Sequence, residues 1–152
     1  MTRWFTKATC LLLAMVMLVP TTAFAAKEEQ TAQPYSLYFV SYNTWLNTMT
    51  ARTFQVGFSV TAKRTMDELG VQLIRVQRSS NGVNNWSTQE TYTPDFYTQM
   101  SDTNSACHMD YVTHTGDYGY YYRAYAEFYA KDSTGTGTIS AYSEVIYIPP
   151  KT

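Results

Sequence analysis

"TFQVGFSVTA", residues 53–62, alternates apolar residues with polar or small ones without a break. In a β-strand every second side chain lies on the same face of the sheet. This stretch is therefore predicted to be a strand with one buried and one solvated face. The predicted buried set is Phe54, Val56, Phe58, Val60 and Ala62.

The period of two continues along the chain on both sides of this stretch. Further strands are predicted at 36–42, 71–80, 86–93, 106–115, 120–130 and 140–149. The Asn81-Gly82 pair is typical of a tight turn, so it is predicted to close a hairpin. Residues 63–70 allow one helical turn. Residues 94–105 have no period and many turn formers, which predicts a loop.

Short strands with regularly spaced turns and no long helix predict an all-β protein. The expected architecture is an antiparallel two-sheet sandwich of about seven strands. The length fits one such domain, which we place at residues 35–152, after a flexible leader at 26–34.

The first 25 residues have the pattern of a signal peptide. Arg3 and Lys7 form a basic start, residues 8–19 form an apolar run, and residues 23–25 form a small-residue cleavage site. The apolar run is shorter than the roughly 20 residues that span a bilayer. We therefore expect cleavage after Ala25 and a secreted protein that is not held in the membrane.

Charge and cysteine content narrow the expected partners. Without Arg3 and Lys7, nine basic residues remain against twelve acidic ones, a net charge of −3. Nucleic acids and anionic membranes need a clustered basic face, so neither is an expected partner. After cleavage Cys107 has no second cysteine, and it lies on the same predicted face of its strand as Met109 and Tyr111. We predict that it is a buried core residue, although an intermolecular disulfide remains open.

The strand at 120–130 separates its tyrosines by parity. One set has no charge and contains two alanines, so it is predicted to face the core: Tyr120, Tyr122, Ala124, Ala126 and Phe128. The other set carries both charges of the strand, so it is predicted to face solvent: Tyr121, Arg123, Tyr125, Glu127 and Tyr129.

The stretch "GYYYRAYAEFYAKDSTGTGTISAYSEVIYI", residues 119–148, resembles the last two strands of a fibronectin type III domain. The resemblance implies an immunoglobulin-like sandwich. It also implies that Tyr120 is a corner tyrosine, whose hydroxyl bonds back to the preceding loop. Together, "FSVTA", "LIRVQRSSNGVNNWSTQET" and "GYYYRA" resemble small exported Gram-positive domains of uncharacterised function.

The sequence lacks the common catalytic and phosphate-binding motifs. One group of residues, His108, Asp110 and His114, raises the alternative of an extracellular hydrolase or a metal-dependent enzyme. On a strand the two histidines would lie about 20 Å apart, too far to bind one ion. We interpret these residues as solvated, and we predict no catalytic residue, metal ligand or cofactor.

Exposed aromatic residues are the strongest functional signal. Tyrosine, tryptophan and arginine are enriched in binding sites, because they offer large contact area or directional hydrogen bonds. We therefore expect an exported, non-enzymatic binding module for an unknown extracellular protein or polysaccharide. The candidate binding residues are Tyr121, Arg123, Tyr125, Tyr129, Trp86 and Tyr97.

Two other interpretations stay open. The tyrosines could simply stabilise the strand, with Tyr147 on the neighbouring strand pairing with one of them. Alternatively, open sheet edges could make this a structural or matrix-assembly protein.

Overall fold

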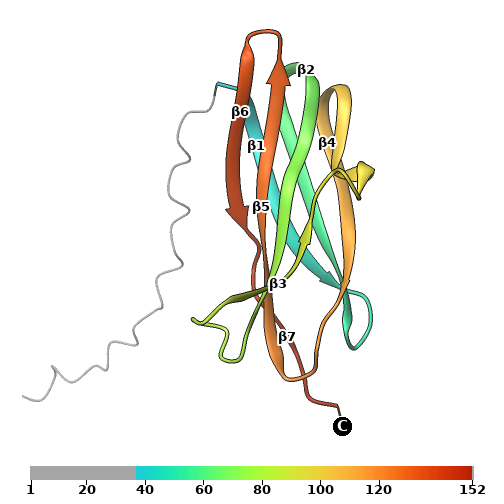
Figure 1. Ribbon diagram of the computed structural model, residues 1–152, viewed down its shortest axis with the longest axis vertical. Coiled ribbons are helices and arrows are strands. Elements are labelled where there is room, and N and C mark those ends of the chain that lie inside the picture. Colours follow the sequence, from blue (N-terminus) through green and yellow to red (C-terminus); the bar gives the residue numbers. More distant parts are fainter. Residues whose placement is uncertain (1–36, 152) are drawn as a thin grey trace, which may run out of the picture. The chain divides into compact units, whose positions relative to one another are not determined.

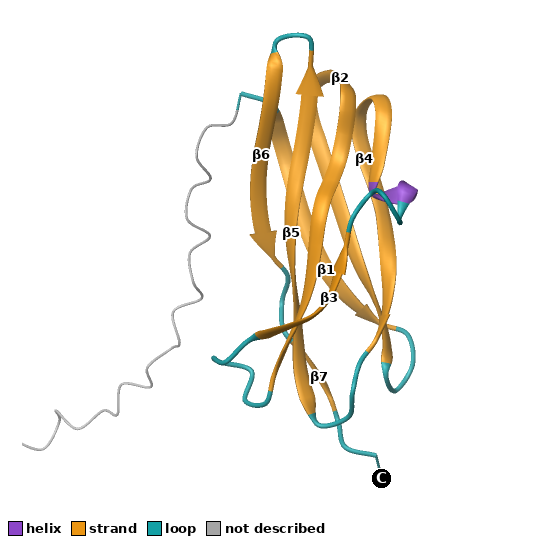
Figure 2. Ribbon diagram, in the orientation of Figure 1, coloured by secondary structure: helices purple, strands orange, loops and turns teal. Residues whose placement is uncertain are grey.

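The computed structural model describes residues 37–151, so the predicted signal peptide and leader lie outside the described residues. The described chain is all-β, and every strand pairing in it is antiparallel (Figure 2), as predicted. The elements are β1 (Phe39–Thr48), β2 (Thr53–Ser79), β3 (Ser87–Tyr92), the 3-10 turn η1 (Thr98–Met100), β4 (Ser101–Thr115), β5 (Tyr120–Asp132), β6 (Gly135–Tyr142) and β7 (Ile146–Ile148).

The long strand β2 organises the whole sheet. Its first half pairs with β1, and its second half pairs with β5 and β3. Strand β4 pairs with the first half and continues past the bend as far as Gly70. Strands β6 and β7 both extend the sheet from β5. The seven strands therefore form one hydrogen-bonded sheet.

This sheet curls until its two halves face each other. Figure 1 shows β1 and the first half of β2 behind β5, β6 and the second half of β2. Ring contacts join the halves: the centroids of Tyr42 and Phe128 lie 5.3 Å apart, and so do those of Phe54 and Tyr122. Because β2 belongs to both halves, the sheet is a curled half-barrel that does not divide into two separate sheets.

The helical turn predicted at residues 63–70 is wrong, because this segment is the part of β2 that passes from one half to the other. The pairing with β4 shifts register between Thr61 and Met66. Met66 and Leu69 are both buried here. Their spacing of three resembles that of a helix, but it arises from the bend in the strand.

The core lies between the two halves of the curled sheet. It confirms the predicted buried faces of β2 and β5, except that Tyr120 is only half-buried. Each large apolar side chain buried in this way stabilises the fold by about 1.5–3 kcal/mol. The buried core residues on these two strands include Phe54, Val56, Phe58, Val60, Ala62, Leu69, Val71, Ile74, Val76, Tyr122, Ala124, Ala126, Phe128 and Ala130.

The predicted faces of β4 are inverted. Cys107 is exposed, and the exposed fractions of Met109 and Tyr111 are 70% and 48%. Val112 is buried because it pairs directly with Val56, and paired residues share a face of the sheet. The register with β2 therefore decides which face of β4 is buried. It turns the face opposite Cys107, which carries Val112, toward the core.

The tyrosine tied to the preceding turn is Tyr122, and not Tyr120 as the resemblance implied. The backbone N–H of Asp117 donates a hydrogen bond to the Tyr122 hydroxyl at 2.7 Å. Tyr120 instead packs under Arg78, whose guanidinium carbon lies 4.2 Å from the centre of its ring.

Two connections differ in how well the sequence predicted them. The hairpin is confirmed, because β2 and β3 pair on either side of Asn81-Gly82, but its connection is longer than the predicted tight turn and runs over residues 80–86. Gly82 has φ 72°, and a Cβ there would lie 2.8 Å from the Tyr121 ring, so glycine fits both constraints. The loop predicted at 94–105 is too long, because β4 begins at Ser101 and pairs with β2.

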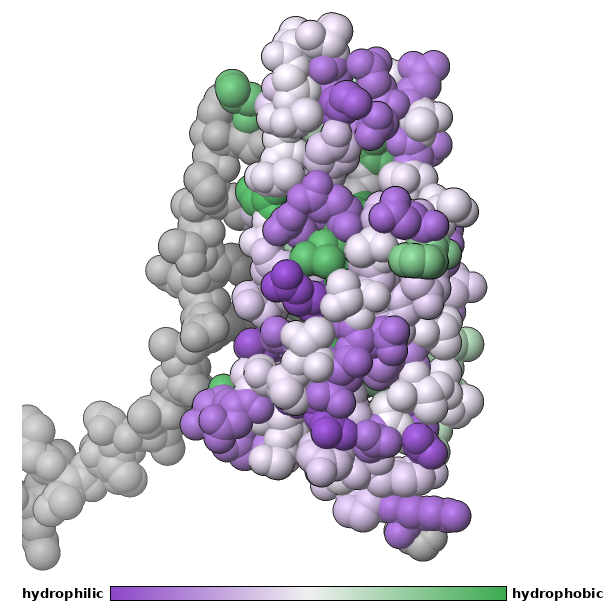
Figure 3. Space-filling model, in the orientation of Figure 1, coloured by the Kyte–Doolittle hydropathy of each residue, from purple (hydrophilic) through white to green (hydrophobic). Residues whose placement is uncertain are grey.

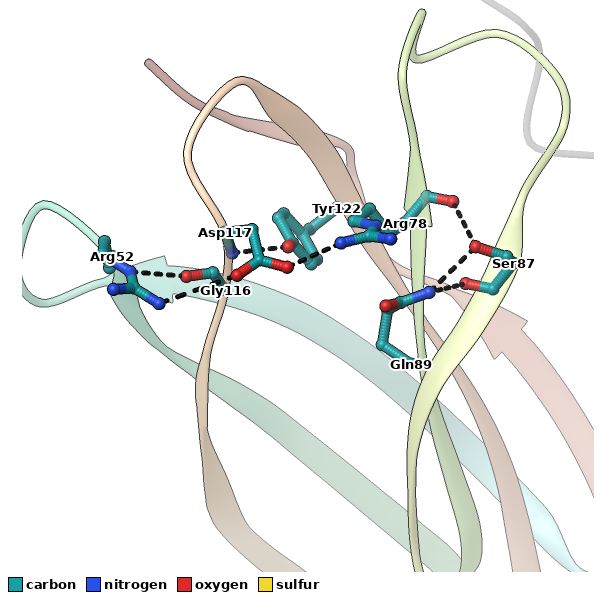
Figure 4. A network of polar contacts seen from close by, with 7 residues as sticks. All are labelled: Arg52, Arg78, Ser87, Gln89, Gly116, Asp117 and Tyr122. Atoms are coloured by element: carbon teal, nitrogen blue, oxygen red, sulfur yellow. Dashed lines mark hydrogen bonds and ion pairs between the residues drawn. The ribbon is translucent and has the colours of Figure 1, made fainter. Parts of the chain in front are cut away.

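Asp117 joins the two ends of β2, as Figure 4 shows. Arg78, near the end of β2, donates to the Asp117 carboxylate at 2.6 Å. Arg52, just before β2, lies 3.7 Å from the same carboxylate and donates to the Gly116 carbonyl at 2.8 Å. The two ends of one strand are thus held at the same place, opposite the bend.

Candidate binding face

The solvent-facing set of β5 lies on the outer face of the sheet, where each of its side chains is half-buried. Cross-strand neighbours from β2, β6 and β7 share this face because they pair directly with it. We call this surface the aromatic face and define it by Arg75, Gln77, Trp86, Tyr121, Arg123, Tyr125, Glu127, Tyr129, Tyr142 and Tyr147.

Two pairs of tyrosines cross between strands on the aromatic face. The rings of Tyr121 and Tyr147 lie 4.5 Å apart, which confirms that Tyr147 pairs with a tyrosine of β5. The rings of Tyr125 and Tyr142 lie 5.1 Å apart. Tyr142 and Tyr147 remain 55% and 47% exposed, so they are the most accessible rings of the face.

Arg123 occupies the middle of the aromatic face, between two rings. Its guanidinium carbon lies 4.3 Å from the centre of the Trp86 ring and 4.4 Å from that of Tyr142. Its Nε donates to the Gln77 side chain at 2.9 Å. The structure therefore brings together Trp86 and Arg123, two of the predicted binding residues.

A second arginine and a carboxylate border this centre. Arg75 is exposed and lies over Tyr125, 5.8 Å from the ring centre. The Tyr125 hydroxyl donates to Glu127 at 3.3 Å, and the side-chain amide of Gln72 also donates to Glu127. Both contacts occupy acceptor positions of Glu127 within the face.

The remaining two predicted residues have different surroundings. Tyr129 lies on the aromatic face beside a hollow of about 180 Å³, which Glu68, Pro94 and Ser101 also line. Tyr97 packs against the core through Tyr92, with their ring centres 4.9 Å apart. Tyr97 is thus a packing residue in this structure.

The histidines of β4 lie in separate surroundings. His108 bonds to the Gln99 carbonyl through Nε2 at 2.8 Å, whereas the Nδ1 of His114 lies 3.0 Å from the Tyr92 hydroxyl. Burial lowers the pKa of His114, and it raises the pKa of Tyr92. Within residues 37–151, no three His, Cys, Asp or Glu side chains gather closely enough to hold a metal ion.

Comparison with known proteins finds no relative. No protein-family model, no curated protein and no solved structure matches the chain. No helix among residues 37–151 has the length and apolar character to cross a membrane. The function of the aromatic face therefore has to be inferred from its own chemistry.

A second hollow, of about 240 Å³, lies outside the other half of the sheet and was not predicted. Trp45, Gln55, Gly57, Met109, Asp110 and Tyr111 line it. Gly57 pairs with Trp45, and a Cβ at Gly57 would lie 2.3 Å from the indole. The isolated glycine within the alternation at 53–62 was the available sequence signal for this close approach.

Proposed function

We propose that this protein is a secreted, non-enzymatic binding module that binds its partner through the aromatic face. The arrangement of Arg123 between Trp86 and Tyr142 is the observation that carries this proposal. Stacking fixes an otherwise flexible side chain before any partner arrives. A partner then loses less conformational entropy on binding, which favours recognition over simple sheet packing.

The exposed rings give such a partner a place to bind. Tyr142 and Tyr147 come from β6 and β7, and they extend the row of rings on β5 sideways. Aromatic side chains present large amphipathic surfaces with few rotatable bonds. An extended segment of a partner would contact several of these rings at once.

The secreted location and the relation to fibronectin type III or immunoglobulin-like domains are part of this proposal. The signal-peptide pattern at residues 1–25 supports export. The tie between Tyr122 and the preceding turn supports the relation, because corner tyrosines of sandwich domains bond to nearby backbone in a similar way.

Assembly is a second candidate function, which the free edge of β6 supports. Within the described residues, β6 pairs only with β5, and its sequence GTGTISAY has no charged residue or proline to discourage pairing. Oligomers that form with rising concentration, and that disappear in Thr138→Lys, would favour this function. The enzymatic alternative has weaker support, since His108 and His114 make unrelated contacts.

The main test compares two exposed tyrosines on opposite faces. Binding of the purified protein to a glycan array and to extracellular proteins would be measured for Tyr142→Ala and for Tyr111→Ala. We expect Tyr142→Ala to weaken binding by about 1–2 kcal/mol while changing stability by less than about 1 kcal/mol. Tyr111→Ala, from the other half of the sheet, should bind like the wild type. Equal effects of both substitutions would contradict the proposal.

A further inference from the structure

Two arginines of the aromatic face have no acidic partner among residues 37–151. Elsewhere in residues 37–151 the ion-paired cations are Arg52, Arg64, Arg78 and Lys131. Arg75 and Arg123 form no ion pair within that part of the chain. Both instead lie against aromatic rings. The unpaired arginines are therefore concentrated on the surface proposed to bind.

The contacts of Arg123 leave its terminal nitrogens available. Its guanidinium carbon lies 4.3 Å and 4.4 Å from the ring centres of Trp86 and Tyr142, and its Nε is bonded to Gln77. Among the described residues, neither of its Nη groups donates a hydrogen bond. A guanidinium donates in its own plane and matches the two oxygens of an acidic group. The free edge of Arg123 is thus suited to an anion.

Arg75 lies close enough to contribute to the same site. It pairs with Tyr125 across the strands, whereas Gln77 pairs with Arg123. Diagonal neighbours of this kind lie about 7–8 Å apart. The carboxylate on this face, Glu127, already accepts hydrogen bonds from Gln72 and Tyr125. The two guanidinium groups therefore outnumber the acidic group of the face.

We propose that the aromatic face binds an anionic polysaccharide. Arg123 and Arg75 bind its acidic groups, which are carboxylates or sulfate esters, while its sugar rings stack on Tyr142 and Tyr125. This inference rests on the proposed binding function and adds the chemical class of the ligand. The chain as a whole is acidic, so this local positive charge is what allows an anionic polymer to approach.

The other residues of the face favour a glycan over an acidic protein. Beside Arg123 and Glu127, the neighbouring strands carry uncharged hydrogen-bonding side chains, Gln77 on β2 and Ser140 on β6. Figure 3 shows this side of the molecule as mostly pale and purple residues with small, separate green areas. A polysaccharide presents hydroxyl groups beside weakly polar ring faces, so it matches hydrogen-bonding side chains placed beside aromatic rings.

The test compares each charged polymer with an uncharged form of the same sugar backbone. Binding of the purified protein to polygalacturonate would be measured by calorimetry in low salt, beside the methyl ester of the same polymer. Dextran sulfate and dextran form a second pair, which distinguishes sulfate from carboxylate recognition. We expect the charged member of at least one pair to bind about tenfold more tightly than its neutral match, with an affinity that falls as salt is added.

Variants then locate the binding site. Arg123→Gln and Arg75→Gln should each weaken binding of the charged polymer about tenfold. Arg64→Gln removes a positive charge that is already paired with Asp132, away from the face, and should change the affinity less than about twofold. If Arg123→Gln unfolds the protein, Arg75→Gln and the comparison of charged with neutral polymers still test whether the face binds an anionic polysaccharide.

Each contrary result has a distinct meaning. Equal binding of charged and neutral polymers, still lost in Tyr142→Ala, would overturn the anionic ligand but leave the binding function intact. Polyglutamate would be measured in the same way as a model of an acidic protein segment. If it binds and no glycan does, the ligand is an acidic protein segment and not a polysaccharide. Binding of none of these polymers would also overturn the inference. The proposed function itself would fail if Tyr142→Ala and Tyr111→Ala had equal effects on every partner found by the glycan array and among the extracellular proteins.

Discussion

The hydroxyl of Tyr122 lies inside the protein and still has a hydrogen-bond partner. The side chain is 1% exposed, and its ring contacts those of Phe54 and His114. The backbone N–H of Asp117 reaches the hydroxyl from the turn between β4 and β5. This bond attaches the turn to the core and satisfies a polar atom that would otherwise be costly to bury.

Removing only this hydroxyl should therefore have a measurable cost. We expect Tyr122→Phe to lower the free energy of unfolding by about 1–2 kcal/mol, and Tyr122→Ala by about 3–5 kcal/mol. Tyr120→Phe should change it by less than about 0.5 kcal/mol, since Tyr120 is half-buried and contacts Arg78 through its ring. Urea denaturation would rank the three variants. A larger loss for Tyr120→Phe than for Tyr122→Phe would contradict this assignment.

His114 should make stability depend on mildly acidic pH. Burial lowers its pKa, and the charges of Glu90 and Asp117 oppose that effect. In the unfolded chain this histidine has its ordinary pKa of 6.5, so it binds the proton more readily than in the folded chain. Stability is therefore complete above pH 6.5, and it falls as the pH decreases from there toward the lowered pKa.

Denaturation curves at several pH values would test this. His114→Gln should remove the loss of stability just below pH 6.5, whereas His108→Gln should retain it because His114 is still present. The carboxylate of Asp132 acts in a different range, because hydrogen bonds from Thr134 and Arg64 lower its pKa from 3.8 to about 2. A loss that persists unchanged in His114→Gln would assign the effect to another group.

At this scale, alternation predicted which residues share a face but not always which face is buried. On β5 the charges of Arg123 and Glu127 correctly indicated which set of residues faces solvent. On β4 the apolar character of Cys107 and Met109 wrongly indicated that their face is buried. The pairing of Val112 with Val56 orients β4, and a pairing between distant strands is not visible in the sequence of either one.

At the scale of the element, β2 depends on a close approach at Gly70. A Cβ at this position would lie 2.3 Å from the Met100 carbonyl oxygen and 2.6 Å from the Ser101 Cα. Both contacts are with backbone, which cannot rotate away as a side chain would. The absence of a side chain at Gly70 allows β4 to begin against the second half of β2.

Gly70→Ala should therefore force β2 and β4 apart. We expect a loss of about 1–3 kcal/mol or more in the free energy of unfolding, as for other insertions into tightly packed sites. Ser59→Ala, at a half-buried position of the same strand, should change it by less than about 0.5 kcal/mol. Thermal and urea denaturation would compare the two. A neutral Gly70→Ala would show that the start of β4 can move without cost.

The elements themselves were largely predictable, and the errors occur where β2 bends and where β4 begins. Regular alternation correctly placed residues 53–62 and 120–130 in strands. The bend disturbs that alternation at Met66 and Leu69, so residues 63–70 resembled a helical turn. Polar residues at Ser101–Ser105 resembled a loop, although their backbone pairs with β2. Backbone hydrogen bonds form regardless of side-chain polarity, so polar strands are easily missed.

At the scale of the molecule, both halves of the sheet should unfold together because they share β2. Trp45 lies on β1 in one half, and Trp86 lies over Arg123 on the other half. We expect the fluorescence of each tryptophan to report the same denaturation midpoint. Trp45→Phe and Trp86→Phe would isolate the two signals, each measured in the proposed mature protein, which begins after Ala25 and so lacks Trp4. Two different midpoints would show that the halves are separate cooperative units.

The aromatic face was only partly predictable, because it is made by register between strands. Parity placed Tyr121, Arg123 and Tyr125 on one side of β5. Tyr142 joins them only because β6 pairs with β5 in a particular register, and it is more exposed than any tyrosine of the predicted set. The stacking of Arg123 also depends on the hairpin that carries Trp86. None of these relations can be derived from one strand alone.

The sharing of β2 also determines when the protein can fold. Val56 pairs with Val112 and Val76 with Ala124, so most partners of this strand are synthesised long after it. Each pairing must first close a long loop, which costs entropy before any contact forms. Proteins dominated by such distant pairings fold in milliseconds to seconds, more slowly than helical bundles. Until β4 and β5 have been synthesised, β2 has only β1 and the short strand β3 beside it, and a chain cut short before β5 leaves much of its apolar side open to aggregation.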